Sequence, residues 1–209
     1  GTEYDGRVGV FSWLSHEVST RSGDGSRPVI CLMDGEHKLW ARKRELLPDN
    51  VVEVLDLWHV MDRLWDVASA LHGADNTASR EFVSDRLRQI LEGKVGRVIG
   101  GLRQTLTKRK LSKATAETIA STITYFSNNQ DRMRYDVCLR EGYPIASGVI
   151  EGACRHVVGD RLDRTGTRWT VDGAVSMLAT RTTYLSDDWN DYQQFRISRE
   201  QTTIHPTTN

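Results

Sequence analysis

The stretches VICLMDG (residues 29–35) and VVEVLD (residues 51–56) decide the fold of this chain. Each is a continuous apolar run of strand length that leads into an aspartate, and a short charged helix is expected between them over residues 37–47. Such runs, rich in β-branched residues, are typical of buried parallel strands. An amphipathic helix follows over residues 58–72, with Gly73 as its C-cap. This strand–helix–strand–helix succession predicts a parallel α/β unit.

After that unit, the apolar spacing indicates long helices without strands. Residues 76–140 carry two helical stripes, and the pair Gly100-Gly101 is expected to bend or break the first helix. A loop then opens a helix over residues 149–161, and a further helix is expected over 171–185. The chain is therefore helix-rich overall, with the strands near its beginning.

The composition is that of an ordinary globular protein, with 209 residues, 38% hydrophobic and 27% charged. The length suits one domain, or one domain that carries an insertion. No apolar run approaches the roughly 20 residues that cross a bilayer, and the first residues lack a signal-peptide pattern. The cysteines, Cys31, Cys138 and Cys154, are too scattered for a disulfide framework or a zinc site. We expect a cytoplasmic protein with buried free thiols and no membrane partner.

Two carboxylates stand where chemistry favours them. Asp34 directly follows a buried strand, and open α/β sheets place their sites at the carboxyl ends of strands. Glu151 is expected in the first turn of its helix, from where its side chain could project towards a strand end. Carboxylate pairs of this kind suit Mg²⁺ or Mn²⁺ together with phosphate oxygens. The plainer alternatives are a turn-forming aspartate and a glutamate that complements the helix dipole.

Asp56 and His59 form a second constellation at the start of a helix. An aspartate N-cap with a nearby hydrogen-bonded histidine explains this spacing without any function. The alternative is that both residues support the metal ligands from behind.

The formal net charge of zero means that any DNA binding must depend on local basic patches. Two clusters of basic residues are candidates for binding phosphate. The first cluster has no intervening acidic residue and comprises Lys94, Arg97, Arg103, Lys108, Arg109, Lys110 and Lys113. The second surrounds the helix of Glu151 and comprises Arg155, Arg161, Arg164 and Arg168. Trp169 could stack on a flipped or frayed base. The alternatives are a solvated helix face and a tryptophan buried in the core.

Taken together, these motifs closely resemble the DDE transposases of ISKra-type bacterial insertion sequences. The motifs are VICLMDG (29–35) followed by Trp40, VLDLWH (54–59), GYPIASGVIEGACR (142–155), and GDR (159–161) through GTRW (166–169). The third is similar to the family's G-x-P-I-x-S-G-x-I-E segment and the last to its R-x-x-x-x-G-x-x-W element. The likeness runs from about residue 28 to residue 189, and the helical middle matches only in general character.

The resemblance implies a partial RNase H-like core, with a parallel or mixed sheet, interrupted by an all-helical insertion. It implies that Asp34 and Glu151 are the second and third carboxylates of the catalytic triad and bind Mg²⁺ or Mn²⁺, with Asp56 and His59 as the accessory pair. The reaction would be hydrolysis of phosphodiesters at element ends, followed by strand transfer from the freed 3′-hydroxyl. The partners would be double-stranded DNA, at insertion-sequence ends and targets, and a second copy of the intact, nucleoid-associated protein.

The resemblance also sets the expected boundaries: 1–74 for the partial core, 75–142 for the insertion, 143–200 for the return to the core, and 201–209 for a frayed tail. The first aspartate of the triad belongs on a strand upstream of Asp34, and only about 28 residues precede that strand. We therefore expect the isolated chain to be an N-terminally truncated transposase that neither cleaves nor joins DNA. Two alternatives stay open: a non-catalytic DNA-binding relic, and another RNase H-like nuclease such as a resolvase.

Overall fold

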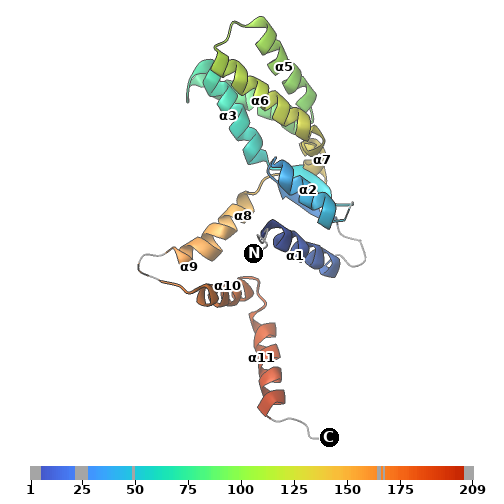
Figure 1. Cartoon of the computed structure of the whole chain (residues 1–209), viewed down its shortest axis with the longest axis vertical. Helices are drawn as coiled ribbons and strands as arrows, with labels where there is room; N and C mark the ends of the chain where they lie inside the picture. Colours follow the sequence, from blue (N-terminus) through green and yellow to red (C-terminus); the bar gives the residue numbers. More distant parts are fainter. Residues whose placement is uncertain (1–5, 22–27, 49, 164–165, 167, 205–209) are drawn as a thin grey trace, which may run out of the picture. The chain divides into compact units, whose positions relative to one another are not determined.

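The structure is a computed structural model that describes residues 6–21, 28–48, 50–163, 166 and 168–204. The chain divides into two compact units, residues 1–147 and 148–209. The elements of the first unit (Figure 1) are α1 (Gly6–Arg21), β1 (Ile30–Met33), α2 (His37–Leu46), β2 (Val52–Leu55), α3 (Leu57–His72), α4 (Thr77–Leu91), α5 (Val95–Lys108), α6 (Lys113–Asn129), the 3₁₀ helix η1 (Gln130–Arg132) and α7 (Tyr135–Arg140).

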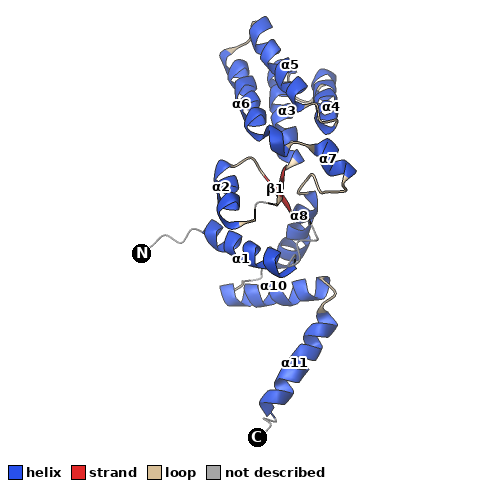
Figure 2. Ribbon diagram, turned by 90° about the vertical axis from the view of Figure 1, so that its right-hand side faces the viewer, coloured by secondary structure: helices blue, strands red, loops and turns tan. Residues whose placement is uncertain are grey.

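The two strands pair in parallel, with Ile30 opposite Val52 and Met33 opposite Leu55. Alternate side chains of a strand face opposite sides, and β1 follows this rule. Its even positions pack against the main core, whereas Cys31 and Met33 pack against a smaller cluster built around α1 and α2. Figure 2 shows the short red strands beside α2, with α3, α4, α5 and α6 packed together next to them.

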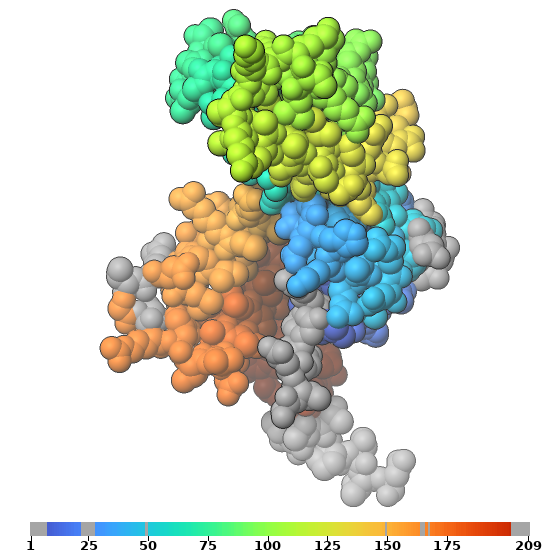
Figure 3. Space-filling model, turned by 45° about the horizontal axis from the view of Figure 1, so that its top comes forward, coloured from blue at the N-terminus to red at the C-terminus, as the bar shows by residue number. Residues whose placement is uncertain are grey.

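One continuous core joins the strands to the helices. Val54 and Leu55 of β2 are fully buried together with Leu64 of α3, Ile119 and Phe126 of α6, and other apolar residues of α4 and α5. Figure 3 shows the green and yellow surface of the helical part packed closely against the blue surface of the α/β part. The helices of the expected insertion therefore share one hydrophobic core with the two strands.

Side-chain caps fix where several helices begin. Asp56 caps α3 by accepting from the Trp58 amide, Asn76 caps α4, and Ser112 caps α6. Gly73 ends α3 with a φ of 89°, a conformation that glycine adopts without strain.

The regular elements of the second unit are all helices in the part that the structure describes. It contains α8 (Gly148–Ala153), the π-helical turn η2 (Cys154–Gly159), α9 (Asp160–Leu162), α10 (Val171–Leu185) and α11 (Trp189–Ile204).

The expected strands and helices are confirmed, and the described chain is a helix-rich α/β protein with a two-stranded parallel sheet. Four expectations are wrong. β1 is half-buried because its side chains pack at the margins of the two hydrophobic clusters, whereas Val54 and Leu55 of β2 are fully buried. Of the three thiols, Cys138 is buried, but Cys31 is half-buried and Cys154 is exposed. Gly100 and Gly101 lie inside an unbroken α5, and the break falls at Gly93 instead, where φ is +75°. Helix α11 continues through the start of the expected tail, and residues 205–209 lie outside the described part. No described helix is long and apolar enough to cross a membrane.

Candidate functional site

The carboxyl ends of the two strands bring Asp34 and Asp56 to the same edge of the sheet. Met33 and Leu55 are partners in the parallel register, so the aspartates that follow them are neighbours, and the Asp56 amide donates to the Met33 carbonyl at 2.8 Å. This is the edge at which parallel sheets place their sites. The two side chains nevertheless have different surroundings.

Asp34 is half-buried, and one of its two carboxylate oxygens is occupied. Its Oδ1 accepts from the Glu36 amide at 2.8 Å, which leaves Oδ2 without a partner among the described residues. Trp40 is buried and donates from Nε1 to the Asp34 carbonyl oxygen at 2.8 Å. This bond gives the tryptophan of the motif a structural role, because it fixes the backbone that carries the carboxylate. A Cβ at position 35 would overlap the ring of Tyr125, so the close approach of the backbone to this ring requires glycine there.

Asp56 is 2% exposed and is held by four groups. Its Oδ1 accepts from the amides of Trp58 (3.2 Å) and Ser147 (3.1 Å). Its Oδ2 accepts from the Ser147 hydroxyl at 2.6 Å and lies 3.2 Å from Nδ1 of His59. Burial acts to raise the pKa of this carboxyl, but the bonds from Ser147, Trp58 and His59 outweigh it and hold the pKa below its ordinary value. Asp56 is therefore an ionised, structural carboxylate that ties the segment before α8 to the sheet.

An acidic cleft lies beside Asp34. Its volume is about 430 Å³, and it is lined by Asp34, Gly35, Glu36, His59, Asp62, Arg63, Asp66 and Tyr125. Sequence analysis identified Asp34 and His59 but missed Glu36, Asp62 and Asp66. A signal for the last two was present, because positions 59, 62 and 66 share one face of a helix. Hard carboxylate oxygens of this kind are suited to a divalent cation.

The cleft is not a closed metal site by itself. No three His, Cys, Asp or Glu side chains converge to hold a metal ion within the part of the chain that the structure describes. A cation beside Asp34 would need further oxygen ligands, from water, from a phosphate, or from another carboxylate such as Glu151.

The second unit carries Glu151 and the second basic cluster. Glu151 is exposed in the first turn of α8, as expected from the sequence, and its placement against Asp34 stays a prediction. Arg155, Arg161 and Arg168 are exposed, whereas Arg164 lies outside the described residues. Trp169 is half-buried, and its indole nitrogen is enclosed without a hydrogen-bond partner in the described chain. Base stacking by Trp169 stays a prediction.

The first basic cluster is partly neutralised. Lys94 pairs with Glu92 at 2.6 Å, and the Lys113 ammonium lies 3.9 Å from Glu117. Lys108, Arg109 and Lys110, at the end of α5, are exposed and have no ion-pair partner among the described residues. Arg97 is likewise exposed without an ion pair in the described chain, so it and the run of three are available to phosphates.

Comparisons with protein-family models, with curated proteins and with solved structures found no match to this chain.

Proposed function

We propose that this chain acts in DNA transposition, and that it carries two carboxylates, Asp34 and Glu151, of a divalent-metal site of the DDE transposase type. One observation carries the proposal. Asp34 and Asp56 are neighbours at the carboxyl edge of a parallel sheet, and Asp56 binds both the amide and the hydroxyl of Ser147, four residues before Glu151. The chain is thus tied to the edge beside Asp34 just before the helix that bears the second carboxylate.

The chemistry follows from hard oxygen ligands. Asp34 and Glu151 would hold Mg²⁺ or Mn²⁺, which activates an attacking oxygen and stabilises the leaving oxygen of a phosphodiester when bound. Asp56 keeps Ser147 in place and orients His59 through its Nδ1. Asp56 and His59 would therefore position the metal ligands without binding the ion themselves. The exposed guanidinium groups of the second unit would neutralise the DNA backbone.

The RNase H-like fold and the homodimer belong to this proposal too. The parallel strand–helix–strand order and the long helices that precede Glu151 are what support the fold assignment. Double-stranded DNA, at element ends and at the target, is the proposed substrate.

The test is a cleavage assay. The chain, expressed with any coding sequence that precedes it in its genome, is incubated with Mg²⁺ or Mn²⁺ and with duplexes taken from the DNA that flanks its gene. We expect metal-dependent cuts at a fixed position, lost in Asp34→Asn and in Glu151→Gln but kept in Glu117→Gln, an exposed carboxylate on α6. Cutting that persists in Glu151→Gln would defeat the site assignment. Preference for a four-way junction over linear ends would indicate a resolvase-like nuclease.

A second candidate function is DNA binding without catalysis. It is favoured by the exposed run of Lys108, Arg109 and Lys110, and by the lack of a three-ligand metal group among the described residues. It predicts salt-sensitive binding to duplex DNA that survives Glu151→Gln, together with no cleavage in any metal. Undetectable binding at low salt would exclude it.

A further inference from the structure

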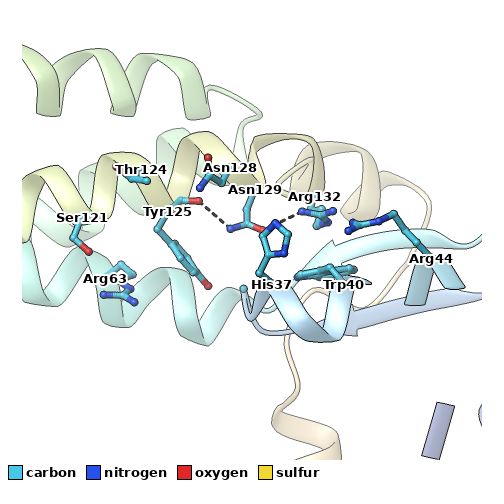
Figure 4. Close-up of a pocket in the computed structure, with 11 residues that line it drawn as sticks. His37, Trp40, Arg44, Arg63, Ser121, Thr124, Tyr125, Asn128, Asn129 and Arg132 are labelled. Carbon is cyan, nitrogen blue, oxygen red and sulfur yellow. Dashed lines mark hydrogen bonds between the residues drawn. The ribbon is translucent and has the colours of Figure 1, made fainter. Parts of the chain in front are cut away.

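A cationic pocket adjoins the acidic cleft and shares Gly35 with it. Figure 4 shows the side chains that line this pocket. Its volume is about 630 Å³, and it runs between α2 and the polar face of α6. It is lined by Gly35, His37, Trp40, Arg44, Arg63, Ser121, Thr124, Tyr125, Asn128, Asn129 and Arg132. No carboxylate is among these residues, although the whole chain has as many acidic as basic residues.

Two of the three guanidinium groups in this pocket are available to a ligand. Arg132 is committed: it donates to Glu53 at 2.6 Å, donates to Asn129 at 3.2 Å, and covers the ring of Trp40. By contrast, Arg44 and Arg63 have no ion-pair partner among the described residues, and Arg63 lies 5.0 Å from the centroid of the Tyr125 ring. Because no carboxylate lines this pocket, its guanidinium groups make it attractive to anions, although Arg63 also faces the carboxylates of the acidic cleft.

The polar side chains suit a ligand larger than a simple ion. Ser121, Thr124, Tyr125 and Asn128 share one face of α6, as their spacing of three and four residues requires. The amide of Asn128 and the hydroxyl of Ser121 are exposed and make no hydrogen bond with described residues, so they can bond a sugar or a base edge. A volume of this size falls within the usual range for small organic ligands, well above what one phosphate fills.

Arg63 connects the two sites. It lines both the cationic pocket and the acidic cleft, as do Gly35 and Tyr125. An enzyme that cleaves a DNA strand must bind its phosphates with cations and hold a metal ion at the scissile bond nearby. Two adjoining cavities, one lined by arginines and one by carboxylates, could supply both.

We propose that this pocket binds a phosphate-bearing nucleotide, with Asn128 and Ser121 on the sugar or base. Arg44 and Arg63 lie at opposite ends of the pocket (Figure 4), and each would bind a phosphate of its own. This inference rests on the proposed function, in which a DNA strand bound here would continue into the cleft that contains Asp34. The nucleotide comes either from a DNA strand or from free mononucleotide, and the two sources share the same phosphate chemistry.

The test measures binding without metal, so that it does not depend on catalysis. Fluorescence anisotropy follows a short labelled oligothymidylate in EDTA, with thymidine 5′-monophosphate, inorganic phosphate and acetate as competitors. Arg44→Gln and Arg63→Gln are each expected to weaken binding about tenfold, because a charged hydrogen bond to phosphate is lost. Each is also expected to lower the salt slope by about 0.7, the value for one phosphate contact on a single strand. Arg42→Gln, on the same helix and paired with Glu45, is the matched control.

The competitors identify the source. Thymidine monophosphate that displaces the labelled strand assigns the pocket to a free nucleotide, and a strand that thymidine monophosphate does not displace assigns it to DNA. Equal binding by wild type, Arg44→Gln and Arg63→Gln, or competition by acetate as strong as by phosphate, overturns the proposal. Asp34→Asn is expected to keep strand binding in EDTA. If Asp34→Asn loses metal-dependent cleavage while neither arginine variant changes strand binding, nucleotide binding by this pocket is refuted and the proposed function still stands.

Discussion

Removing the carboxylate of Asp56 is the most informative perturbation of the folded structure. The side chain caps α3 through the Trp58 amide, and it accepts two bonds from Ser147, 91 residues further along the chain. Asp56→Ala removes all of these acceptors at once. Asp56→Asn keeps an oxygen for the two amides, but it removes the charge and replaces the oxygen that accepts from the Ser147 hydroxyl with an NH₂ donor.

The structure sets the size of the effect. Loss of an aspartate N-cap costs about 1 kcal/mol. Leaving the Ser147 donors without an acceptor in a part-buried site costs about 1–3 kcal/mol more. Asp56→Ala should therefore lower the free energy of unfolding by about 2–4 kcal/mol. For Asp56→Asn we expect about 1–2 kcal/mol, since charge-assisted bonds are roughly twice as strong as neutral ones.

The assay is urea unfolding followed by circular dichroism, over a range of pH. The folded pKa of Asp56 lies below its unfolded value of about 3.9. Its stabilisation is therefore complete above the unfolded pKa and is lost as the pH falls through the folded pKa. The gap in stability between wild type and Asp56→Asn should be constant near neutral pH and should shrink below about pH 4.

Two results would refute this reasoning. One is an Asp56→Ala protein within about 0.5 kcal/mol of wild type, a size typical of surface substitutions. The other is a stability gap for Asp56→Asn that grows as the pH falls.

Three further changes test other contacts, all by urea or thermal unfolding. Glu53→Gln removes the carboxylate that pairs with both the Lys43 ammonium, whose side chain is 4% exposed, and Arg132, and should cost about 3 kcal/mol; full stability would mean that both cations find other partners or solvent. Tyr135→Phe removes the 2.7 Å bond to the buried Leu55 carbonyl and should cost about 1–3 kcal/mol, whereas no change would show that the carbonyl finds another donor. Gly93→Ala should cost about 1–2 kcal/mol because φ there is +75°, and a stabilised variant would contradict that backbone conformation.

Local patterns were sufficient to predict the strands and the start of α3. The apolar runs of the two strands were visible in the sequence, and the aspartate at the end of the second is the N-cap of the helix that follows. The parallel pairing followed because a helix-length segment separates the two runs. Asp34 and His59, both singled out from the sequence, line one cleft, and their roles stay predictions.

Features that depend on backbone conformation or on distant contacts were not predictable. Gly93 and the pair Gly100-Gly101 are the same residue type, but only the first adopts a positive φ and separates two helices. The cationic pocket joins Arg44 to Arg132, 88 positions apart in the chain, through contacts that no local spacing encodes. Asp62 and Asp66 of α3 are an intermediate case. Their helical spacing from His59 was visible in the sequence, but nothing in the sequence connected them to Asp34.

The most direct test of the metal site replaces Mg²⁺ with Fe²⁺ and lets ascorbate and peroxide generate hydroxyl radicals at the bound ion. The radicals cut the polypeptide near the metal, and mass spectrometry maps the cuts. The account predicts cuts around Asp34 and around Glu151 in the same molecule population, both lost in Asp34→Asn. Cuts confined to the Asp34 cleft, with none near Glu151, would contradict the claim that these two carboxylates share one cation.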